Sequence, residues 1–183
     1  MEEMAANDRV IGGLNPLSTD RAKQLYSSFC NGEMLLTNAT TAEMAKLTEN
    51  SFRDVNIAFA NELSIISDKL GIDVWELIEL ANHHPRVNIL NPGPGVGGHC
   101  IAVDPWFIVS SAQEEAKLIR TAREVNDGKP AYVIAKITEA VEAEGADSIA
   151  ALGIAFKPDI DDLRESPALS IVQQMAEKWP EKN

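Results

Sequence analysis

The chain has 183 residues and a formal net charge of −12, with 28 acidic residues against 16 lysines and arginines. This length allows one domain or two small ones. The acidic balance excludes a nucleic-acid backbone as the expected partner, because that would require a basic patch. No apolar run is long enough to span a bilayer, and the N-terminal residues MEEMAANDR lack the basic and apolar regions of a signal peptide. We therefore expect a cytoplasmic protein with no membrane partner.

Two cysteines, Cys30 and Cys100, are too few and too far apart for a disulfide framework or a metal-ligand spacing. We expect no bound metal. His83 and His84 are adjacent on a predicted loop with no carboxylate or cysteine to complete a site, so we interpret them as polar surface.

Residues 1–38 predict a strand, a helix and a second strand. Residues 9–11 form a short apolar segment that runs into two glycines, Ser18 or Thr19 can cap a helix through about Phe29, and residues 34–37 have a strand pattern. Two strands with one helix make a poor independent domain, because each strand needs partners and a covered face. We interpret this segment as the C-terminal remnant of an α/β domain.

Residues 40–70 predict the longest helix. Thr40 and Glu43 fit a capping box, Gly71 supplies the stop, and no proline or glycine intervenes. At 1.5 Å per residue this helix would be roughly 45 Å long, which suits the spine of a domain or a dimer interface. One face carries Lys46, Asn50 and Arg53, which project the same way. This stripe is either a solvated face or part of a site.

The glycine-rich segment 91–106, NPGPGVGGHCIAVDPW, follows a predicted helix over 74–82 that Asp73 caps. Cys100 follows four glycines, with His99 between the last of them and the cysteine, and Asp104 and Pro105 predict the N-cap and first residue of a helix through roughly Ala112. The positive end of a helix dipole favours a thiolate, so Cys100 is a candidate nucleophile. The alternative is a small buried apolar residue.

The glycines also match GxGxxG formally, at Gly93, Gly95 and Gly98. No strand precedes this loop, and Pro92 and Pro94 flank its first glycine. Because the dinucleotide fingerprint requires a preceding strand and a following helix, we do not interpret this loop as an NAD site.

The rest of the sequence predicts helices over 113–126 and 130–144, a strand over 148–153, and a helix from Ser166 and Pro167 to about Lys178. A lone parallel strand cannot bury both of its faces, so this last domain is also incomplete. The predicted fold is mainly α: a helical central dimerisation domain, 39–146, with a long spine helix, flanked by incomplete α/β (Rossmann-like) pieces at 1–38 and 147–183.

Three motifs carry a resemblance to a known family. They are AEMAKLTENSFRDVNIAFANEL at 42–63, HHPRVNILNPGPGVGGHCIAVDPWF at 83–107 and GIAFKPDIDDLRESPA at 153–168. In this order they resemble the nucleotide-sugar 6-dehydrogenases of the UDP-glucose/GDP-mannose dehydrogenase family, in particular the branch that acts on UDP-N-acetyl-D-mannosamine. The resemblance implies a Rossmann NAD-binding domain, a central dimerisation domain and a UDP-binding domain. It predicts that this chain is a truncated form, with 1–38 from the first domain and 147–183 from the third, and inactive alone because the NAD fingerprint is absent.

The implied reaction is oxidation of a sugar C6 alcohol to a carboxylate by two NAD⁺. By resemblance, Cys100 attacks the intermediate aldehyde to form a thiohemiacetal, which is oxidised to a thioester and hydrolysed. Lys46 matches the lysine that stabilises the oxyanion, Asn50 its hydrogen-bonding support, and Asp104 a carboxylate that orients water or takes protons. The matches to sugar-nucleotide contacts are Arg53, His84, Arg86, Gly97 and Lys157. In family dimers, the contribution of His84 and Arg86 is made across the interface.

Arg164 matches a residue that reaches the cofactor, with a salt bridge to Asp161 or Glu165 as the alternative. Cys30 matches no functional position. Three other interpretations stay open: a catalytically silent module for dimerisation and substrate binding, a UDP-glucose 6-dehydrogenase, and an unrelated thiol enzyme. The last is disfavoured because no histidine–acid pair stands at a recognisable spacing.

Overall fold

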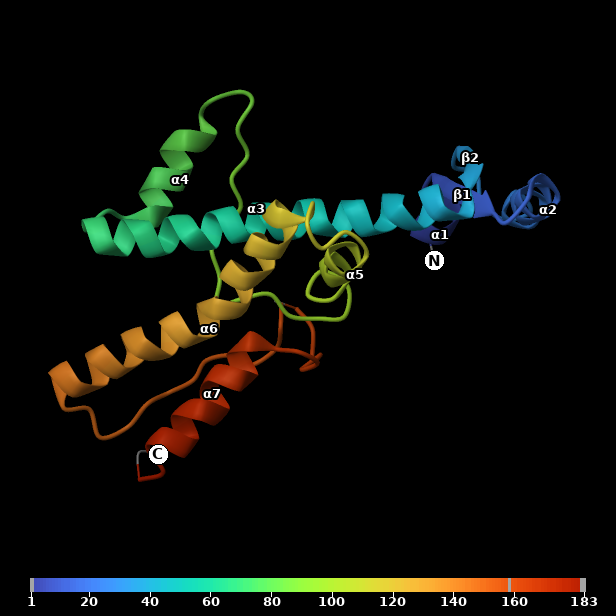
Figure 1. Ribbon diagram of the computed structural model, residues 1–183. Coiled ribbons are helices and arrows are strands. Elements are labelled where there is room, and N and C mark those ends of the chain that lie inside the picture. Colours follow the sequence, from blue (N-terminus) through green and yellow to red (C-terminus); the bar gives the residue numbers. More distant parts are fainter. Residues whose placement is uncertain (1, 158, 182–183) are drawn as a thin grey trace. The chain divides into compact units, whose positions relative to one another are not determined.

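The computed structural model describes residues 2–157 and 159–181, and the chain forms two compact units, Met1–Glu49 and Asn50–Asn183. Helices dominate the part of the chain that is described, and its strands are two short parallel ones (Figure 1). The predicted mainly-α fold with a long spine helix is confirmed. None of the helices in this part of the chain is long and apolar enough to cross a membrane.

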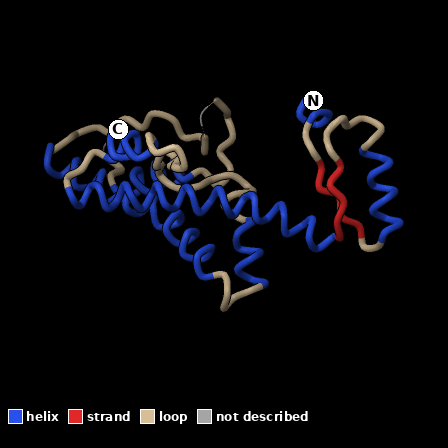
Figure 2. The backbone as a smooth tube through the Cα atoms, turned by 90° about the horizontal axis from the view of Figure 1, so that it is seen from above, coloured by secondary structure: helices blue, strands red, loops and turns tan. Residues whose placement is uncertain are grey.

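The first unit contains a parallel strand pair with a crossover helix. After α1 (Glu2–Ala6), strand β1 (Arg9–Gly13) pairs in parallel with β2 (Met34–Asn38), and α2 (Pro16–Tyr26) joins them and packs on both. Figure 2 shows the two strands side by side with the helix beside them. Ile11, in the middle of β1, is buried. The predicted strand, helix and strand are confirmed.

The cap of α2 differs from the prediction. Asn15, and not Ser18 or Thr19, is the N-cap: its side-chain oxygen accepts the Ser18 N–H at 3.0 Å, and the Ser18 hydroxyl accepts the Asn15 N–H at 3.1 Å. Pro16 favours this start, because a proline suits the first helical position and its missing N–H has no partner to lose there. The helix ends at Tyr26, three residues before the predicted end at Phe29.

Helix α3 (Ala39–Leu70) is the 32-residue spine that the sequence predicted. Asn38 caps it in place of Thr40, since its side-chain oxygen accepts the Thr41 N–H at 2.9 Å. Gly71 ends it as expected: its φ of +68° is a conformation that glycine adopts without strain, and the Ile72 N–H then reaches the Ser67 carbonyl at 2.9 Å.

The second unit adds four helices to the larger part of α3. Helix α4 (Val74–Asn82) begins at its predicted cap, Asp73, whose carboxylate accepts the Trp75 N–H at 2.8 Å. It is followed by α5 (Asp104–Ser111), α6 (Lys117–Glu144) and α7 (Pro167–Lys178), with α6 in contact with both α5 and α7. Ser166 caps α7 as predicted, accepting the Leu169 N–H at 3.3 Å and donating to the Ile154 carbonyl at 2.7 Å.

Two predicted elements of the second unit differ from the structure. The sequence predicted two helices separated near Asp127 and Gly128, but α6 continues through both and through Pro130, and it bends partway along (Figure 1). Proline removes one backbone hydrogen bond and bends a helix without necessarily ending it. Residues 148–153, predicted as a strand, have no regular structure. No neighbouring strand within the described residues pairs with them, and a strand is stable only when it is paired.

Candidate active site

Cys100 lies at the turn that leads into α5. Its carbonyl accepts the N–H groups of Val103, at 3.1 Å, and of Asp104, at 2.8 Å. Its thiol is exposed, whereas Cys30 is 6% exposed and its thiol donates to the Asn7 carbonyl at 3.3 Å. The interpretation as a small buried residue therefore describes Cys30 and not Cys100. Cys100 is open to an external electrophile.

Asp104 occupies the first position of α5, and Val103, not Asp104, stands at the N-cap without a side-chain hydrogen bond. This corrects the predicted cap. The Asp104 carboxylate instead accepts a hydrogen bond from the side-chain amide of Asn50, on α3, at 2.5 Å. Asn50 is 4% exposed and Asp104 is half-buried, so this contact is partly shielded from water. The structure thus brings together two predicted site residues that are 54 positions apart.

The glycines before Cys100 permit close packing against the C-terminal segment. A Cβ at Gly97 would lie 2.4 Å from the Glu165 carbonyl oxygen and 2.7 Å from the Phe156 Cβ. Gly98 has a φ of +82° and donates its N–H to the Arg164 carbonyl at 3.3 Å. These positions need glycine for packing and for backbone conformation. Residues predicted to surround a ligand therefore also join the loop to the segment before α7.

Two predicted ligand-binding cations lie in that segment. The Arg164 guanidinium binds the Asp162 carboxylate at 2.5 Å, and this interaction lowers the pKa of Asp162 to about 2. The acidic partner is Asp162, and not Asp161 or Glu165 as the alternative proposed. Lys157 is exposed, with its ammonium 5.7 Å from the centre of the Phe156 ring.

The remaining predicted residues are exposed. Arg53 lies on α3 and makes no hydrogen bond or ion pair within the described residues. His84 and Arg86 lie on the turn after α4, where the His84 Nδ1 accepts the Arg86 N–H at 3.3 Å. Lys46 belongs to the first unit, and its ammonium lies 3.1 Å from the Glu49 carboxylate. Their proposed contacts with a substrate stay predictions.

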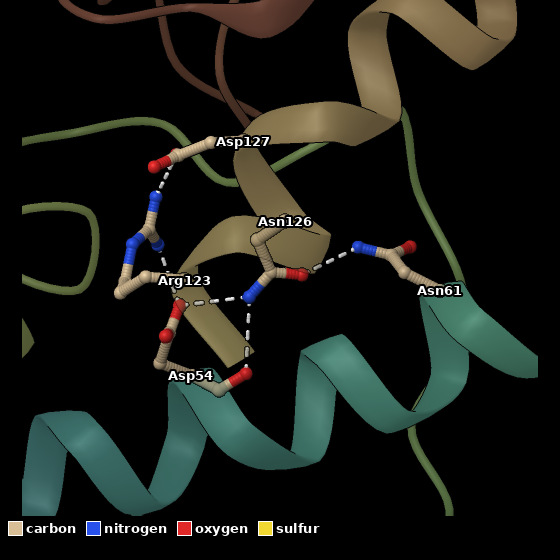
Figure 3. A network of polar contacts seen from close by, with 5 residues as sticks. All are labelled: Asp54, Asn61, Arg123, Asn126 and Asp127. Atoms are coloured by element: carbon tan, nitrogen blue, oxygen red, sulfur yellow. Dashed lines mark hydrogen bonds and ion pairs between the residues drawn. The ribbon is translucent and has the colours of Figure 1, made fainter. Parts of the chain in front are cut away.

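A buried polar network that the sequence reasoning missed lies next to this loop (Figure 3). The Arg123 guanidinium, 1% exposed, donates to the Asp54 carboxylate at 2.6 Å and also binds Asp127. The side-chain amide of Asn126 donates to the same Asp54 oxygen at 2.8 Å and to the Asp54 carbonyl at 3.1 Å. Asn61 donates to Asn126 at 2.8 Å and accepts the Gly93 N–H at 2.8 Å. The network therefore connects α3 and α6 to the start of the glycine-rich segment 91–106, here called the glycine loop.

Burial raises the pKa of Asp54, although Arg123 and the Asn126 amide act in the opposite direction. One signal in the sequence pointed to this face: Asn50, Asp54 and Asn61 are separated by four and seven residues, which places them on one side of a helix. They are short polar residues of modest helix propensity in the middle of a long helix. Of the three, only Asn50 was identified as a candidate from the sequence, and Asp54 and Asn61 were missed.

Helix α2, which joins the two strands, has its N-terminus occupied by its own cap: the Asn15 side chain accepts the Ser18 N–H at 3.0 Å, and the Thr19 hydroxyl accepts the N–H of Gly13, the last residue of β1, at 3.0 Å. A pyrophosphate bound at this helix would compete with Asn15 for the Ser18 N–H. Within the described residues, no group of three or more histidine, cysteine or acidic side chains is arranged to hold a metal.

The chain matches two sequence models of one protein family. The central domain of the UDP-glucose/GDP-mannose dehydrogenase family matches residues 40–128, which include α3, the glycine loop and Cys100, and the UDP binding domain of that family matches residues 150–181. The site built around Cys100 therefore falls inside the central domain. The chain belongs to the UDP-glucose/GDP-mannose dehydrogenase family, as its three motifs predicted.

Individual proteins of known name are similar to nearly the whole of this chain. The chain is 64% identical over 176 residues to a UDP-N-acetyl-D-mannosamine dehydrogenase of Campylobacter jejuni. This match covers 96% of this chain and 43% of the relative. The chain is 61% identical over 178 residues to an NDP-N-acetyl-D-galactosaminuronic acid dehydrogenase of Ralstonia nicotianae, covering 97% of this chain and 42% of the relative. A solved UDP-N-acetyl-mannosamine dehydrogenase from Staphylococcus aureus superposes with a TM-score of 0.87 at 48% identity, over 100% of this chain and 43% of that structure. The chain thus spans less than half the length of these proteins.

Proposed function

We propose that this chain is part of an NAD-dependent dehydrogenase that oxidises the C6 alcohol of UDP-N-acetyl-D-mannosamine to the uronate. Membership of the family and the names of the similar proteins from Campylobacter jejuni and Staphylococcus aureus support this substrate. The single observation that carries the chemistry is the exposed thiol of Cys100 at the head of α5, with the Asn50–Asp104 hydrogen bond one turn further on.

Cys100 acts on the C6 aldehyde. Its thiolate forms a carbon–sulfur bond while the carbonyl π electrons move to oxygen, so the aldehyde stays attached and its hydrogen stays on carbon. NAD⁺, when bound, supplies the acceptor for one hydride in each of the two oxidations. Water then attacks the thioester, which returns the thiolate and leaves the carboxylate. Lys46 stabilises the oxyanion, and the exposed position of its ammonium leaves it accessible for that role.

Asn50 and Asp104 orient the reacting groups. The Asn50 amide fixes one carboxylate oxygen of Asp104, which leaves the other oxygen to accept a proton from water during hydrolysis of the thioester. The residues that contact the substrate are Arg53, His84, Arg86, Gly97 and Lys157. Arg164 contacts the cofactor after its guanidinium has released the Asp162 carboxylate. Residues 1–38 belong to the NAD-binding Rossmann domain, 39–146 form the central dimerisation domain, and 147–183 belong to the UDP-binding domain.

The enzyme acts as a homodimer through the central helical domain. An apolar stripe on α3 supports this: Phe52, Phe59 and Ile66 are spaced seven residues apart and are 70%, 54% and 43% exposed. Apolar side chains at this spacing form the seam along which helices pair. Both cysteines are free, which supports a cytoplasmic location, because cytosolic thiols are kept reduced.

Two alternatives are tested beside this proposal. One is a silent module that dimerises and binds the sugar nucleotide without turnover, and the other is a UDP-glucose 6-dehydrogenase. Mixing the 183-residue chain with UDP-N-acetylmannosamine and NAD⁺ tests the first alternative, since NADH formation would contradict it. A stable dimer that forms no NADH would support it.

A sharper test supplies the rest of the enzyme from a relative. The matching 176-residue span of the Campylobacter jejuni dehydrogenase is replaced by this chain, and NADH formation is followed with UDP-N-acetylmannosamine and with UDP-glucose. We expect two NADH per molecule of the first sugar and a loss of at least ~10³-fold in kcat for Cys100→Ser. Lys46→Ala should lower kcat without lowering Tm, because Lys46 is exposed. Full activity of the Cys100→Ser chimera would refute the role of the thiol, and preference for UDP-glucose would support the second alternative.

A further inference from the structure

We propose that Asn61 is a positioning residue that anchors the N-terminal end of the loop carrying Cys100. This inference rests on the proposed role of Cys100. Helix α3 holds this loop at two places. The Asn50 amide binds Asp104, four residues after Cys100, and the Asn61 side-chain oxygen accepts the N–H of Gly93, seven residues before it. The 93–104 segment is therefore fixed at both ends by asparagines of one helix.

The two anchors share one face of α3. Asn50 and Asn61 are 11 residues apart, which is about three helical turns. Both are buried, at 4% and 0% exposed. Because the two side chains project from one rigid helix, the distance between the two ends of the loop is set by that helix. A loop between fixed ends has fewer conformations than one held at a single end.

The Asn61 side chain is itself held in place. Its amide donates to Asn126, and Asn126 donates in turn to Asp54, which also accepts from Arg123 (Figure 3). Both polar atoms of the Asn61 side chain are therefore used, one toward α6 and one toward the loop. A buried network in which the members fix one another's orientation is a rigid support for a functional group. The support for Gly93 is thus the helix pair and not one flexible side chain.

The loop needs such an anchor because it lacks regular structure. Residues 87–99 form neither helix nor strand. Before Gly93, the Asn82 side chain holds Ile89 by two hydrogen bonds, at 2.7 and 3.0 Å, and after it the Arg164 carbonyl accepts the Gly98 N–H at 3.3 Å. Between Ile89 and Gly98, the Asn61 contact is the hydrogen bond that the described residues give the loop backbone. Without the Asn61 contact, the stretch before Gly98 would have the Gly93 N–H unpaired in a partly buried place. An unpaired donor in such a place is unfavourable, so the loop would move to expose it to water.

The test uses the full 183-residue chain and does not depend on turnover. Amide hydrogen exchange is measured for Gly93 in the unchanged chain and in Asn61→Ala, which removes the oxygen that accepts the Gly93 N–H. The matched control is Ile78→Ala, which removes a buried side chain of α4 that is 4% exposed and outside the network.

We expect the Gly93 amide to exchange at least ~10-fold faster in Asn61→Ala than in the unchanged chain. Ile78→Ala should accelerate exchange in α4 without selectively accelerating Gly93. If Asn61→Ala does not fold, the proposal is tested by two exchange rates in the unchanged chain. There the Gly93 amide must exchange at least ~10-fold more slowly than the Val96 amide. Equal exchange at those two amides, or equal Gly93 exchange in Asn61→Ala and in the unchanged chain, would overturn the proposal.

In the Campylobacter jejuni chimera, Asn61→Ala should lower kcat by ~10-fold or more and change the KM for the sugar nucleotide by less than ~3-fold. The reason is that a displaced thiol affects the chemical step more than it affects binding. An unchanged kcat together with faster Gly93 exchange would show an anchor that has no part in positioning Cys100, and would overturn the proposal. A chimera without any turnover would refute the proposed function, while the exchange result would still report on the anchor.

Discussion

Replacement of Arg123 by alanine would leave the Asp54 carboxylate buried with no cation beside it. Asp54 is 0% exposed, one of its oxygens has no partner within the described residues, and the other would keep only the Asn126 amide. Breaking a buried ion pair from one side typically costs about 3–5 kcal/mol, because the remaining charge is left uncompensated. We expect Arg123→Ala to lower the free energy of unfolding by that amount.

Asp54→Asn is the matched variant, because it removes the other charge of the pair. Arg123 keeps the carboxylate of Asp127, which is half exposed and on the same helix. The guanidinium would therefore stay compensated, and the loss is that of a charged hydrogen bond, about 1.5–3 kcal/mol. The structure thus predicts an asymmetry, with the arginine variant less stable than the aspartate variant by about 1–3 kcal/mol.

Urea denaturation followed by circular dichroism measures both variants. With a slope of about 2 kcal/mol/M, a loss of 3–5 kcal/mol moves the midpoint by about 1.5–2.5 M. The pKa of Asp54 is already raised by burial, and loss of Arg123 raises it further. A carboxyl whose pKa is higher in the folded state than in the unfolded state loses stability as pH rises through that interval. The defect of Arg123→Ala should therefore be smaller at pH 5 than at pH 7. Equal losses in the two variants with no pH dependence would refute the reasoning.

Three further predictions follow from the geometry. Iodoacetamide should modify Cys100 at least ~10-fold faster than Cys30 in the folded chain, because the first thiol is exposed and the second is buried against Asn7; mass spectrometry of the two peptides checks this, and equal rates would contradict it. Gly97→Ala should lower the free energy of unfolding by about 1–3 kcal/mol in urea denaturation, since its Cβ would meet the Glu165 carbonyl, whereas Gly128→Ala, where a Cβ meets nothing within 4 Å, should not destabilise the chain. Lys129→Met should leave that free energy unchanged or raise it by up to ~1 kcal/mol at pH 7, because burial lowers the pKa of Lys129 and charging it in the folded state is unfavourable. The unchanged chain should gain stability from this group as pH rises toward the ordinary lysine pKa of 10.5, and the variant should lack that gain; a variant less stable by more than ~1 kcal/mol would contradict the sign.

The sequence predicted those elements whose ends are decided locally. Asp73 before α4, Ser166 and Pro167 at the start of α7, and Gly71 at the end of α3 were all identified from residue type and position. A cap is a contact between residues two or three positions apart, so its chemistry can be read from a short window. Asn15 and Asn38 were missed because serine and threonine nearby compete for the same role.

Errors arose where distant contacts decide the structure. Gly128 and Pro130 predicted a break in α6, but the helix continues, and Arg123 and Asn126 on it are held by partners on α3. Residues 148–153 have a strand composition, yet strand formation depends on a neighbour that no local pattern can supply. For the same reason, Asp104 was assigned to a cap when its partner, Asn50, lies 54 positions away.

The polar face of α3 is explained by tertiary contacts and not by the helix itself. Asparagine and aspartate each cost about 0.5 kcal/mol relative to alanine inside a helix, so Asn50, Asp54 and Asn61 weaken α3 locally. All three are buried, and each binds a group on another segment: Asp104 on α5, Arg123 on α6 and Gly93 on the loop. Asn56 lies on the same helix but donates only to the Phe52 carbonyl one turn back. Its alanine variant should therefore regain helix propensity without loosening any other segment. That contrast identifies the buried face of α3 as the element that joins α5, α6 and the Cys100 loop into one unit.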